Sequence, residues 1–179
     1  KKLAKFEGFL PYEDYQIVPM ENAVGYDVYL MSPYKRSLTQ FCKSAPFTHL
    51  KAVNLGLDLC AALAVCRRAG LLYVDLKPGN IFISRDKTYR IGDLGFVELD
   101  SLQYTSLPGK YRSPYSPPEA RNDLNTLNDT VDIYALGMIL YQIFNNGALP
   151  QDTGKPLPPP ATVDEEMTGI LLKACALDP

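Results

Sequence analysis

The chain of 179 residues is 46% hydrophobic and 21% charged, with a formal net charge of −2, a composition typical of one globular domain with enough apolar residues for a core. A net charge so close to zero argues against nucleic acid or an acidic membrane surface as the main partner. The longest uninterrupted apolar run, 59–66, is too short to span a bilayer and no signal peptide is evident, so we expect no membrane insertion and a cytoplasmic location.

Hydrophobic periodicity and turn residues predict short strands and longer helices. In chain order, the predicted elements are strands 15–19 and 26–31, a short helix 37–42, a helix 49–69, a hairpin of strands 81–84 and 88–91, a helix 131–144, a proline-rich connector 150–160 and a last helix that ends near 176.

Three of these segments carry more specific expectations. Helix 49–69 has a candidate buried stripe, and helix 131–144 is apolar nearly all round, which is typical of a helix that runs through a core. Segment 95–119 contains several prolines and is expected to be irregular. Residues 162–165 have the pattern of a capping box, which would open the last helix. The predicted stripe of helix 49–69 consists of Leu50, Val53, Leu57 and Ala61.

The cysteines have no spacing that is typical of a metal site. We expect them to be reduced and mostly buried thiols, as in a cytosolic protein. They are Cys42, Cys60, Cys66 and Cys175.

Polar side chains flank the hairpin predicted at 81–91. Asp75-Leu76-Lys77-Pro78-Gly79-Asn80 precedes it and Asp93-Leu94-Gly95 follows it. Because an antiparallel hairpin returns the chain to its starting end, Asn80 and Asp93 are expected to lie side by side. Their side chains offer the oxygen ligands that Mg²⁺ prefers, and Asp75 and Lys77 can reach the same space. The sequence therefore predicts a site for phosphoryl transfer.

Two later motifs extend this pattern. Pro117-Pro118-Glu119-Ala120 and Asp132-Ile133-Tyr134-Ala135-Leu136-Gly137 follow in an order and spacing that resemble the catalytic lobe of protein kinases. The resemblance covers about 15–179. It implies an α+β, mainly α fold: the large C-terminal lobe with two short β-hairpins, and a small lobe that is largely missing.

The resemblance also implies a division of the chain. Residues 1–31 would be a remnant of the small lobe, 32–36 the hinge, and 37–179 the large lobe, cut before its final helices. The chain starts at Lys1 rather than Met and ends at Pro179, and we expect it to be a piece of a longer polypeptide.

The resemblance implies ATP and Mg²⁺ as cofactors and a protein as substrate. Asp75 would orient the substrate hydroxyl and accept its proton, while Lys77 would steady the transferred phosphate and Asn80 and Asp93 would hold Mg²⁺. Phe82 would pack under the adenine ring. A lysine at position 77 is more typical of Ser/Thr-directed members. The residues to which the resemblance gives structural or activation-segment roles are Gly95, Arg112, Ser113, Tyr115, Glu119 and Asp132.

The segment joining the lobes is expected near Met31-Ser32-Pro33-Tyr34. In the family this hinge binds adenine through one carbonyl and, two residues later, one N–H. If Leu30 preceded the hinge, that N–H would have to come from Pro33, which has none. We therefore prefer the register in which Met31 precedes the hinge, Ser32 gives the carbonyl and Tyr34 the N–H.

The chain departs from the family where the usual His-Arg-Asp reads Tyr73-Val74-Asp75. Val74 cannot pair with a phosphate, so phosphorylation of the activation segment is not expected to be the main switch. Arg112 stands where a threonine usually bonds the catalytic aspartate, and Ser113 is the candidate substitute. The possible phosphorylation sites in question are Ser101, Tyr104, Thr105 and Ser106.

Two further expectations concern carboxylates that the family uses in its architecture. Asp132 would accept hydrogen bonds from the backbone of the catalytic loop. Glu119 would pair with a buried arginine further along the fold, and no evident partner for it follows in this sequence. An unpaired buried carboxylate is costly, so Glu119 is expected to be exposed, paired elsewhere or paired beyond position 179.

The sequence contains no glycine-rich phosphate loop and no Val-Ala-Ile-Lys strand. The chain by itself is therefore expected to bind ATP weakly and to turn over little. An isolated hairpin at 15–31 would leave strand edges exposed, which allows self-association.

Three functions remain open at this point. The leading one is transfer of the ATP γ-phosphate to Ser/Thr hydroxyls of proteins by the parent protein. A pseudokinase-like binding or scaffold module is the alternative, which the altered residues Val74 and Arg112 favour. A small-molecule phosphotransferase such as the aminoglycoside kinases agrees with Gly79 but not with the motifs at 117–120 and 132–137.

Overall fold

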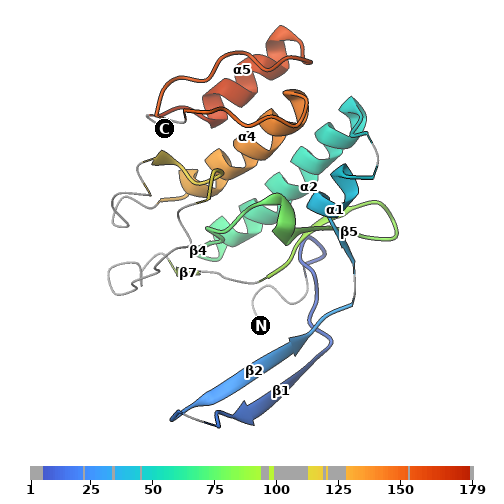
Figure 1. The fold of residues 1–179 in the computed structure, drawn as a ribbon, viewed down its shortest axis with the longest axis vertical. Helices are drawn as coiled ribbons and strands as arrows, with labels where there is room; N and C mark the ends of the chain where they lie inside the picture. The colour runs from blue at the N-terminus through green and yellow to red at the C-terminus, as the bar shows by residue number, and fades with distance from the viewer. Residues whose placement is uncertain are drawn as a thin grey trace.

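The structure, a computed structural model, describes residues 6–21, 23–33, 35–44, 46–93, 97–98, 113–118, 120, 128–152 and 154–177. Helices and short strands are mixed, and the long helices form most of the core (Figure 1). In chain order the elements are β1 (Asp14–Pro19), β2 (Tyr26–Met31), β3 (Arg36–Ser37), α1 (Leu38–Cys42), α2 (His49–Arg68), β4 (Leu71–Leu72), the 3-10 helix η1 (Pro78–Asn80), β5 (Ile81–Ile83), β6 (Tyr89–Ile91), β7 (Val97–Glu98), α4 (Thr130–Phe144) and α5 (Glu165–Ala174). Every helix and hairpin predicted from the sequence is present, with ends that differ by up to a few residues.

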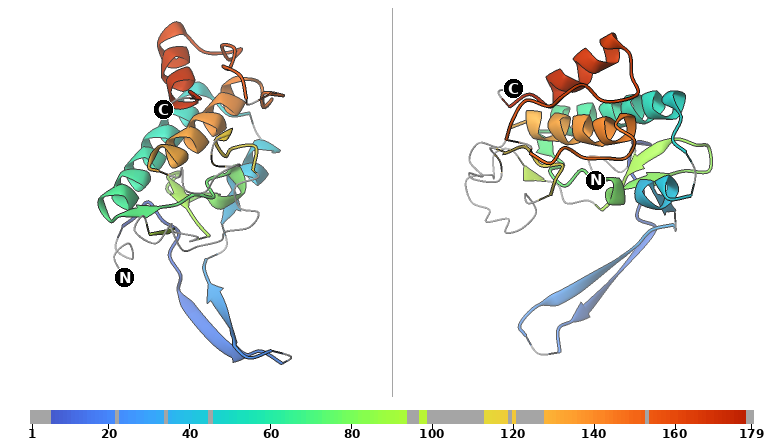
Figure 2. Two further views of the ribbon diagram at one scale, coloured as in Figure 1. Left: turned by 90° about the vertical axis from the view of Figure 1, so that its left-hand side faces the viewer. Right: turned by 45° about the horizontal axis from the view of Figure 1, so that its top comes forward.

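β1 and β2 form an antiparallel hairpin that extends away from the helices (Figures 1 and 2). Tyr15 lies opposite Leu30 and Ile17 opposite Val28. Because side chains alternate along a strand, these four residues share one face of the hairpin with Tyr26. All five are more than half exposed, so this face is an apolar surface that no other described part of the chain covers.

Helix α2 packs with α4 and with β6. The predicted buried stripe is wrong, because Leu50 and Leu57 are 69% and 64% exposed. The helix is apolar on several sides, so its periodicity fits more than one face, and tertiary packing selects among them. The residues that α2 buries are Ala52, Leu55, Leu59, Ala62, Leu63 and Cys66.

By length and composition, α2 is the single helix of the described part that could cross a membrane, with a mean hydropathy of 1.4. The premise that no apolar segment is long enough to span a bilayer is therefore wrong, and the expectation of no membrane insertion itself stays a prediction. Core helices of soluble proteins pass the same test, and 33% of the apolar window of α2 is buried inside the molecule.

Helix α4 runs between α2 and α5 (Figures 1 and 2), as predicted from its apolar residues on all sides. Gly137 permits the close approach of α5, because a Cβ at this position would lie 2.8 Å from the sulfur of Cys175 and 2.9 Å from the Cβ of Ala174. Gly147, with φ of +82°, ends the helix, and its N–H donates to the carbonyl of Gln142 at 2.8 Å.

Helix α5 begins later than the capping-box pattern predicted. The N-cap is Asp164, whose side chain accepts a hydrogen bond from the N–H of Met167 at 2.8 Å. The hydroxyl of Thr162 instead donates to the carbonyl of Phe144 at 2.6 Å. Thr162 therefore fixes the connector to the end of α4 rather than capping α5.

Two small sheets join segments that are distant in the sequence. β5 pairs with both β3 and β6, and β4 pairs with β7, all antiparallel. The prediction of two hairpins was incomplete, because β3, β4 and β7 add strands of two residues each. β7 also lies within the segment that was expected to be irregular.

The segment before β1 adds one more connection. Phe9 forms a parallel bridge with Ile91, and the N–H of Leu10 donates to the carbonyl of Ile91 at 2.7 Å. The N–H of Ile91 donates in turn to the carbonyl of Gly8 at 2.9 Å. This pairing places Leu10 beside the β5–β6 hairpin.

Candidate functional site

The loop between β4 and η1 is held from the side of α4. Asp132, in the first turn of α4 and 4% exposed, accepts hydrogen bonds from the N–H of Tyr73 at 2.8 Å and from the N–H of Val74 at 2.7 Å. Val74 has a φ of +71°, an uncommon conformation for a β-branched residue. The two hydrogen bonds stabilise the turn that immediately precedes Asp75.

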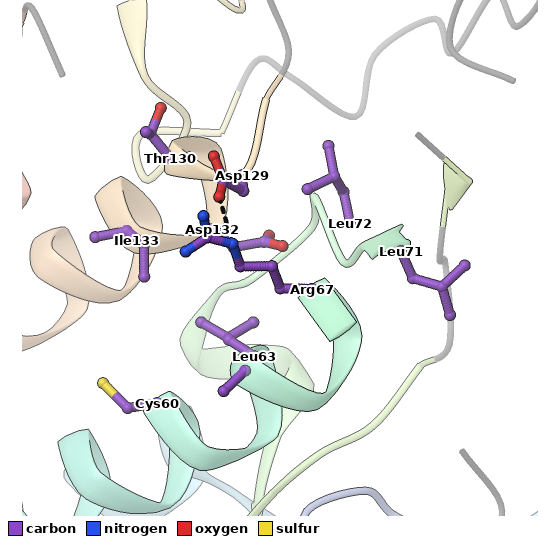
Figure 3. Close-up of a pocket in the computed structure, with 10 residues that line it drawn as sticks. Cys60, Leu63, Arg67, Leu71, Leu72, Asp129, Thr130, Asp132 and Ile133 are labelled. Carbon is purple, nitrogen blue, oxygen red and sulfur yellow. Dashed lines mark ion pairs between the residues drawn. The ribbon is translucent and has the colours of Figure 1, made fainter. Parts of the chain in front are cut away.

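Asp132 has an unusual environment for a carboxylate. Burial raises its pKa to about 6, and the hydrogen bonds from Tyr73 and Val74 oppose that rise. Figure 3 shows Asp132 at the start of α4, beside Arg67 at the end of α2 and near Leu72. Arg67 itself forms an ion pair with Asp129, with 2.7 Å between Nε and Oδ2.

Asp75, Lys77 and Asn80 lie in direct contact. The ammonium of Lys77 is 2.8 Å from Oδ2 and 3.0 Å from Oδ1 of Asp75. The side-chain nitrogen of Asn80 donates to the carbonyl and to Oδ2 of Asp75, both at 3.0 Å. The carboxylate of Asp75 therefore contacts the cation of Lys77 and the amide of Asn80. These charge-assisted hydrogen bonds fix the geometry of three of the predicted site residues.

The hairpin returns the chain as predicted. Ile81 lies opposite Ile91, and the N–H of Gly92 donates to the carbonyl of Asn80 at 2.8 Å. Asp93 is the next residue, exposed and with a φ of +54°. The backbones of Asn80 and Asp93 are thus neighbours at one end of the hairpin.

Tyr73 joins the loop to this end of the hairpin. Its hydroxyl donates to the carbonyl of Gly92 and, at 3.0 Å, to that of Asp93. Burial raises the pKa of the Tyr73 phenol above its ordinary value, and the carboxylates of Asp93 and Asp75 raise it further. Tyr73 is therefore a neutral hydrogen-bond donor in the folded protein.

The donor set agrees with Mg²⁺ bound together with phosphates. The nitrogen of the Asn80 amide is committed to Asp75, so its oxygen is the atom that it could offer to a cation. Asp93, the second residue after β6, could offer its carboxylate. Among the described residues, no group of three or more His, Cys, Asp or Glu side chains could hold a metal. An ion bound through few protein oxygens plus substrate phosphates is the usual arrangement for Mg²⁺.

A cavity of about 410 Å³ lies beside this cluster, a volume within the range of small-molecule sites. Two residues predicted to bind the nucleotide, Ser32 and Phe82, line it together. The full set of lining residues is Leu10, Ser32, Pro33, Lys35, Ser37, Gln40, Gly79 and Phe82. We call it the first cavity.

Phe82 is held against the backbone at Gly92. A Cβ at Gly92 would lie 2.5 Å from the ring of Phe82, closer than real carbon contacts allow. The absence of a side chain at position 92 therefore sets where the ring of Phe82 lies.

Of the other two predicted hinge residues, Met31 and Tyr34, the structure describes Met31. Met31 is the last residue of β2, its side chain is 58% exposed, and its carbonyl accepts a hydrogen bond from the N–H of Glu13 at 2.8 Å. It does not line the first cavity. Tyr34 lies outside the described residues, so the register of the hinge stays a prediction.

Part of the predicted activation segment can be located. Ser113 accepts a hydrogen bond from the N–H of Tyr115 at 3.2 Å, and the hydroxyl of Tyr115 donates to the side-chain oxygen of Gln142 at 2.7 Å. The contact expected between Ser113 and Asp75 stays a prediction. Gly95, Arg112 and Glu119 lie outside the described residues.

Sequence reasoning assigned four lining residues of the first cavity to no nucleotide site, namely Leu10, Ser37, Gln40 and Gly79, whereas Lys35 lies within the predicted hinge at 32–36. Gln40 had a recognisable signal, since it forms a capping box with Ser37, but that signal concerns helix α1 and not a cavity. Leu10 had none, because its position depends on the backbone pairing with Ile91.

Comparisons with known proteins identify a family for this chain. The model of a family described as "Protein kinase domain" matches residues 14–166. The Wee1-like protein kinase of Oryza sativa subsp. japonica is 32% identical over 112 residues, which are 63% of this chain and 21% of that protein. The serine/threonine-protein kinase PknB of Mycolicibacterium smegmatis is 28% identical over 153 residues, covering 75% of this chain and 24% of that protein.

A third relative, eukaryotic translation initiation factor 2-alpha kinase 3 of Bos taurus, is 32% identical over 104 residues, which are 51% of this chain and 9% of that protein. The chain therefore spans a quarter or less of the length of these relatives. Since the family model covers most of its residues, the chain belongs to the protein kinase domain family.

Proposed function

We propose that the parent protein of this chain transfers the γ-phosphate of ATP to Ser and Thr hydroxyls of protein substrates. The observation that carries the proposal is the contact of Asp75 with both Lys77 and Asn80, at the end of the hairpin where Asp93 follows. Phosphoryl transfer depends mainly on positioning and on charge stabilisation. Asp75 supplies a carboxylate that can accept a proton, Lys77 supplies a cation, and Asn80 and Asp93 supply oxygen ligands for a metal ion.

Each side chain has a role in this proposal. Asp75 orients the acceptor hydroxyl and accepts its proton, since its carboxylate is held in place by Lys77 and Asn80. The side chain of Lys77 is 40% exposed, and its ammonium steadies the transferred phosphate. Asn80 and Asp93 hold Mg²⁺, which neutralises charge on the phosphates when it is bound.

The first cavity is the proposed adenine site. Phe82 and Leu10 supply apolar surface, and Ser32 lies in the lining, where its carbonyl would bind adenine. The names of the relatives PknB and Wee1-like kinase support a protein as the substrate, and Lys77 favours Ser and Thr as acceptors. The proposed location is cytoplasmic.

The 179 residues by themselves are proposed to bind ATP weakly, because their sequence holds no glycine-rich phosphate loop and no Val-Ala-Ile-Lys strand. The division into a small-lobe remnant at 1–31, a hinge at 32–36 and a large lobe at 37–179 belongs to the same proposal. A phosphate-transfer assay on this chain that gave about 1–100 s⁻¹, as in intact kinases, would contradict it.

The test of the main proposal is the Asp93→Ala variant of the full-length parent, with Asp86→Ala as its matched control. Asp86 is an exposed aspartate in the turn at the other end of the same hairpin. Radioactive phosphate transfer should be abolished in Asp93→Ala and retained in Asp86→Ala, with circular dichroism unchanged in both. Metal-dependent transfer that survives Asp93→Ala would refute the role of Asp93.

A non-enzymatic scaffold is the second candidate, which Val74 favours because the family's arginine is absent there. It requires that the full-length parent bind partners without transferring phosphate, so the assay above separates the two functions directly.

The apolar face of the β1–β2 hairpin (Tyr15, Ile17, Tyr26, Val28 and Leu30) is the proposed route of self-association for the chain in isolation. Light scattering should give a larger mass for this chain than for an Ile17→Lys variant. Equal masses at all concentrations would exclude this face.

A further inference from the structure

The connector between α1 and α2 carries an exposed serine, Ser44, whose hydroxyl contacts an arginine. The Oγ of Ser44 accepts a hydrogen bond from Nη2 of Arg36 at 2.5 Å and donates to the carbonyl of Phe41 at 2.9 Å. Arg36 belongs to β3, which pairs with β5. A guanidinium, the group that matches phosphate geometry well, is therefore placed at the atom of Ser44 that a phosphate would occupy.

A second cation lies on the same aromatic ring as Arg36. The guanidinium carbon of Arg36 is 5.8 Å from the centroid of the Phe41 ring, and the ammonium of Lys51, in the first turn of α2, is 5.0 Å from it. Phe41 packs edge-on against Phe47, which packs in turn against Tyr89. The ring that the two cations share is thus anchored to the β5–β6 hairpin, and it holds both cations near the connector.

The structure describes no carboxylate that pairs with these cations. The sequence holds no acidic residue from 28 to 57, and within the described part of the chain no ion pair includes a cation of this stretch. Asp58 of α2 accepts instead from the N–H of Tyr89 at 2.8 Å, and Asp86 of the β5–β6 turn accepts from Thr88. The cations of the stretch are Lys35, Arg36, Lys43 and Lys51.

From these observations we infer that Ser44 is a site of phosphorylation, and that Arg36 and Lys51 bind its phosphate. A phosphoserine carries a charge of about −1.5 to −2 at pH 7, which nearby cations stabilise. The bound phosphate would join β3 to the start of α2. Since Lys35 and Ser37, on either side of Arg36, line the first cavity, phosphorylation would restrain one wall of that cavity. The inference goes beyond the proposed function and does not depend on it, because another protein kinase can modify Ser44.

The modification requires no change in the fold of the connector. The hydroxyl oxygen of Ser44 attacks the γ-phosphorus of ATP, the bond from that phosphorus to the β,γ-bridging oxygen breaks, and ADP leaves with the bond electrons. The hydroxyl proton passes to a base of the modifying kinase. The carbonyl of Phe41 then loses one donor but still accepts from the N–H of Ser44 at 3.0 Å. Ser44 and its neighbours Lys43 and Pro46 are exposed, so an enzyme can reach the hydroxyl.

Phosphopeptide mapping tests whether Ser44 is modified. The full-length parent is isolated from its source with phosphatase inhibitors, and the peptides that contain Ser44 are sequenced by mass spectrometry. We expect phosphate on Ser44. Thr48 is the internal control, because it is exposed in the same connector but its hydroxyl caps α2. Phosphate on Thr48 alone, or on neither residue in any growth condition, would overturn the inference.

Phosphorus NMR tests whether the folded chain binds the phosphate. Phosphoserine is installed at position 44 of this chain with a suppressor tRNA, and the second pKa of its phosphate is measured by titration. Nearby cations favour the doubly charged form, so this pKa should lie about one pH unit below that of the same protein unfolded in urea. Equal values in the folded and unfolded protein would overturn the inference.

Variants identify the cations that bind the phosphate. Arg36→Gln and Lys51→Gln should each move the phosphate pKa back toward its value in the unfolded protein, whereas Arg36→Lys keeps the charge and should move it less. The matched control is Arg68→Gln, which should leave the pKa unchanged. Arg68 is exposed in the last turn of α2, about 25 Å from Lys51 along the helix. Equal effects of Arg36→Gln and Arg68→Gln would overturn the inference.

Hydrogen exchange measures the restraint that the phosphate would impose. The backbone amides of β3 and of the connector should exchange about tenfold more slowly in the phosphorylated chain than in the unmodified one. This difference should disappear in Arg36→Gln and persist in Arg68→Gln. Exchange that phosphate leaves unchanged, or slows equally in both variants, would show that the phosphate does not join these segments and would overturn the inference.

Discussion

The hydroxyl of Tyr73 donates a hydrogen bond to the backbone carbonyl of Asp93, 3.0 Å away, and so joins the loop of Asp75 to the end of the β5–β6 hairpin at which Asn80 lies. Tyr73 is fully buried, and the same hydroxyl also donates to the carbonyl of Gly92. The relative positions of the proposed metal ligands therefore depend on a residue that contacts neither metal nor substrate in our proposal.

Removal of this hydroxyl should destabilise the fold. In Tyr73→Phe, two carbonyls lose a donor, and we expect the free energy of unfolding to fall by about 1–3 kcal/mol. Urea denaturation measures the change. Tyr26, an exposed residue of strand β2, provides the control, since Tyr26→Phe should change the free energy of unfolding by no more than about 0.5 kcal/mol. Equal effects of the two variants would mean that the Tyr73 hydrogen bonds contribute nothing.

The raised pKa of Asp132 predicts a specific dependence on pH. The folded protein binds a proton at Asp132 more tightly than the unfolded chain, because burial raises the pKa from 3.8 to about 6. The stabilisation of the folded protein by this tighter proton binding is fully present below pH 3.8 and is lost as pH rises through about 6. The free energy of unfolding should fall by up to about 3 kcal/mol over this range.

The Asp132→Asn variant lacks this titration. At low pH it should be less stable than wild type, because one of the buried N–H groups of Tyr73 and Val74 loses its acceptor. The difference in unfolding free energy between the two proteins, measured in urea across this pH range, should shrink as pH rises. Parallel pH profiles would show that Asp132 has an ordinary pKa in the folded protein.

Two glycines, one beside Phe82 and one in α5, should respond differently to the same substitution. In Gly92→Ala, the new Cβ would overlap the ring of Phe82, so the ring must move, and we expect a loss of about 1–3 kcal/mol in stability. In Gly169→Ala, within α5 and outside the lining of the first cavity, the Cβ would meet no atom within 4 Å. Binding of a fluorescent ATP analogue should weaken about tenfold in Gly92→Ala alone, and similar affinities in both variants would exclude Phe82 from the site.

The cysteines should fall into two classes of reactivity. Cys66 and Cys175 are buried, and burial raises the pKa of each thiol to about 12. Cys42 and Cys60 are exposed, although partial burial raises their pKa values too. Brief treatment with a maleimide at neutral pH, followed by peptide mass spectrometry, should label only the exposed pair. Labelling of Cys66 at the rate of Cys60 would contradict the packing of α2.

Local sequence patterns account for the parts of the fold that were predicted correctly. The β5–β6 hairpin has β-branched and aromatic runs around a polar turn, and α4 has apolar residues on every side, so each is specified within its own segment. The approach of Asn80 to Asp93 follows from the hairpin alone, which is why it could be predicted without coordinates.

The predictions that were wrong or incomplete concern features that depend on contacts between distant parts of the chain. The buried face of α2 was misassigned because several faces of that helix are apolar and only its neighbours decide between them. Thr162 and Asp164 are both good N-cap residues, and the choice depends on whether the carbonyl of Phe144 is within reach of Thr162. The position of Leu10 depends on a bridge between Phe9 and Ile91, for which no local pattern exists.

The hydrogen bonds of Asp132 have a consequence for the order of folding. They join residues that are 58 and 59 positions apart in the sequence, so the turn at Val74 cannot become fixed until α4 has docked against α2. Contacts of this kind form late, since a long loop must close first. Substitutions in the buried part of α4 that contact no ligand should therefore lower the fraction of molecules in which the loop carrying Asp75 is ordered.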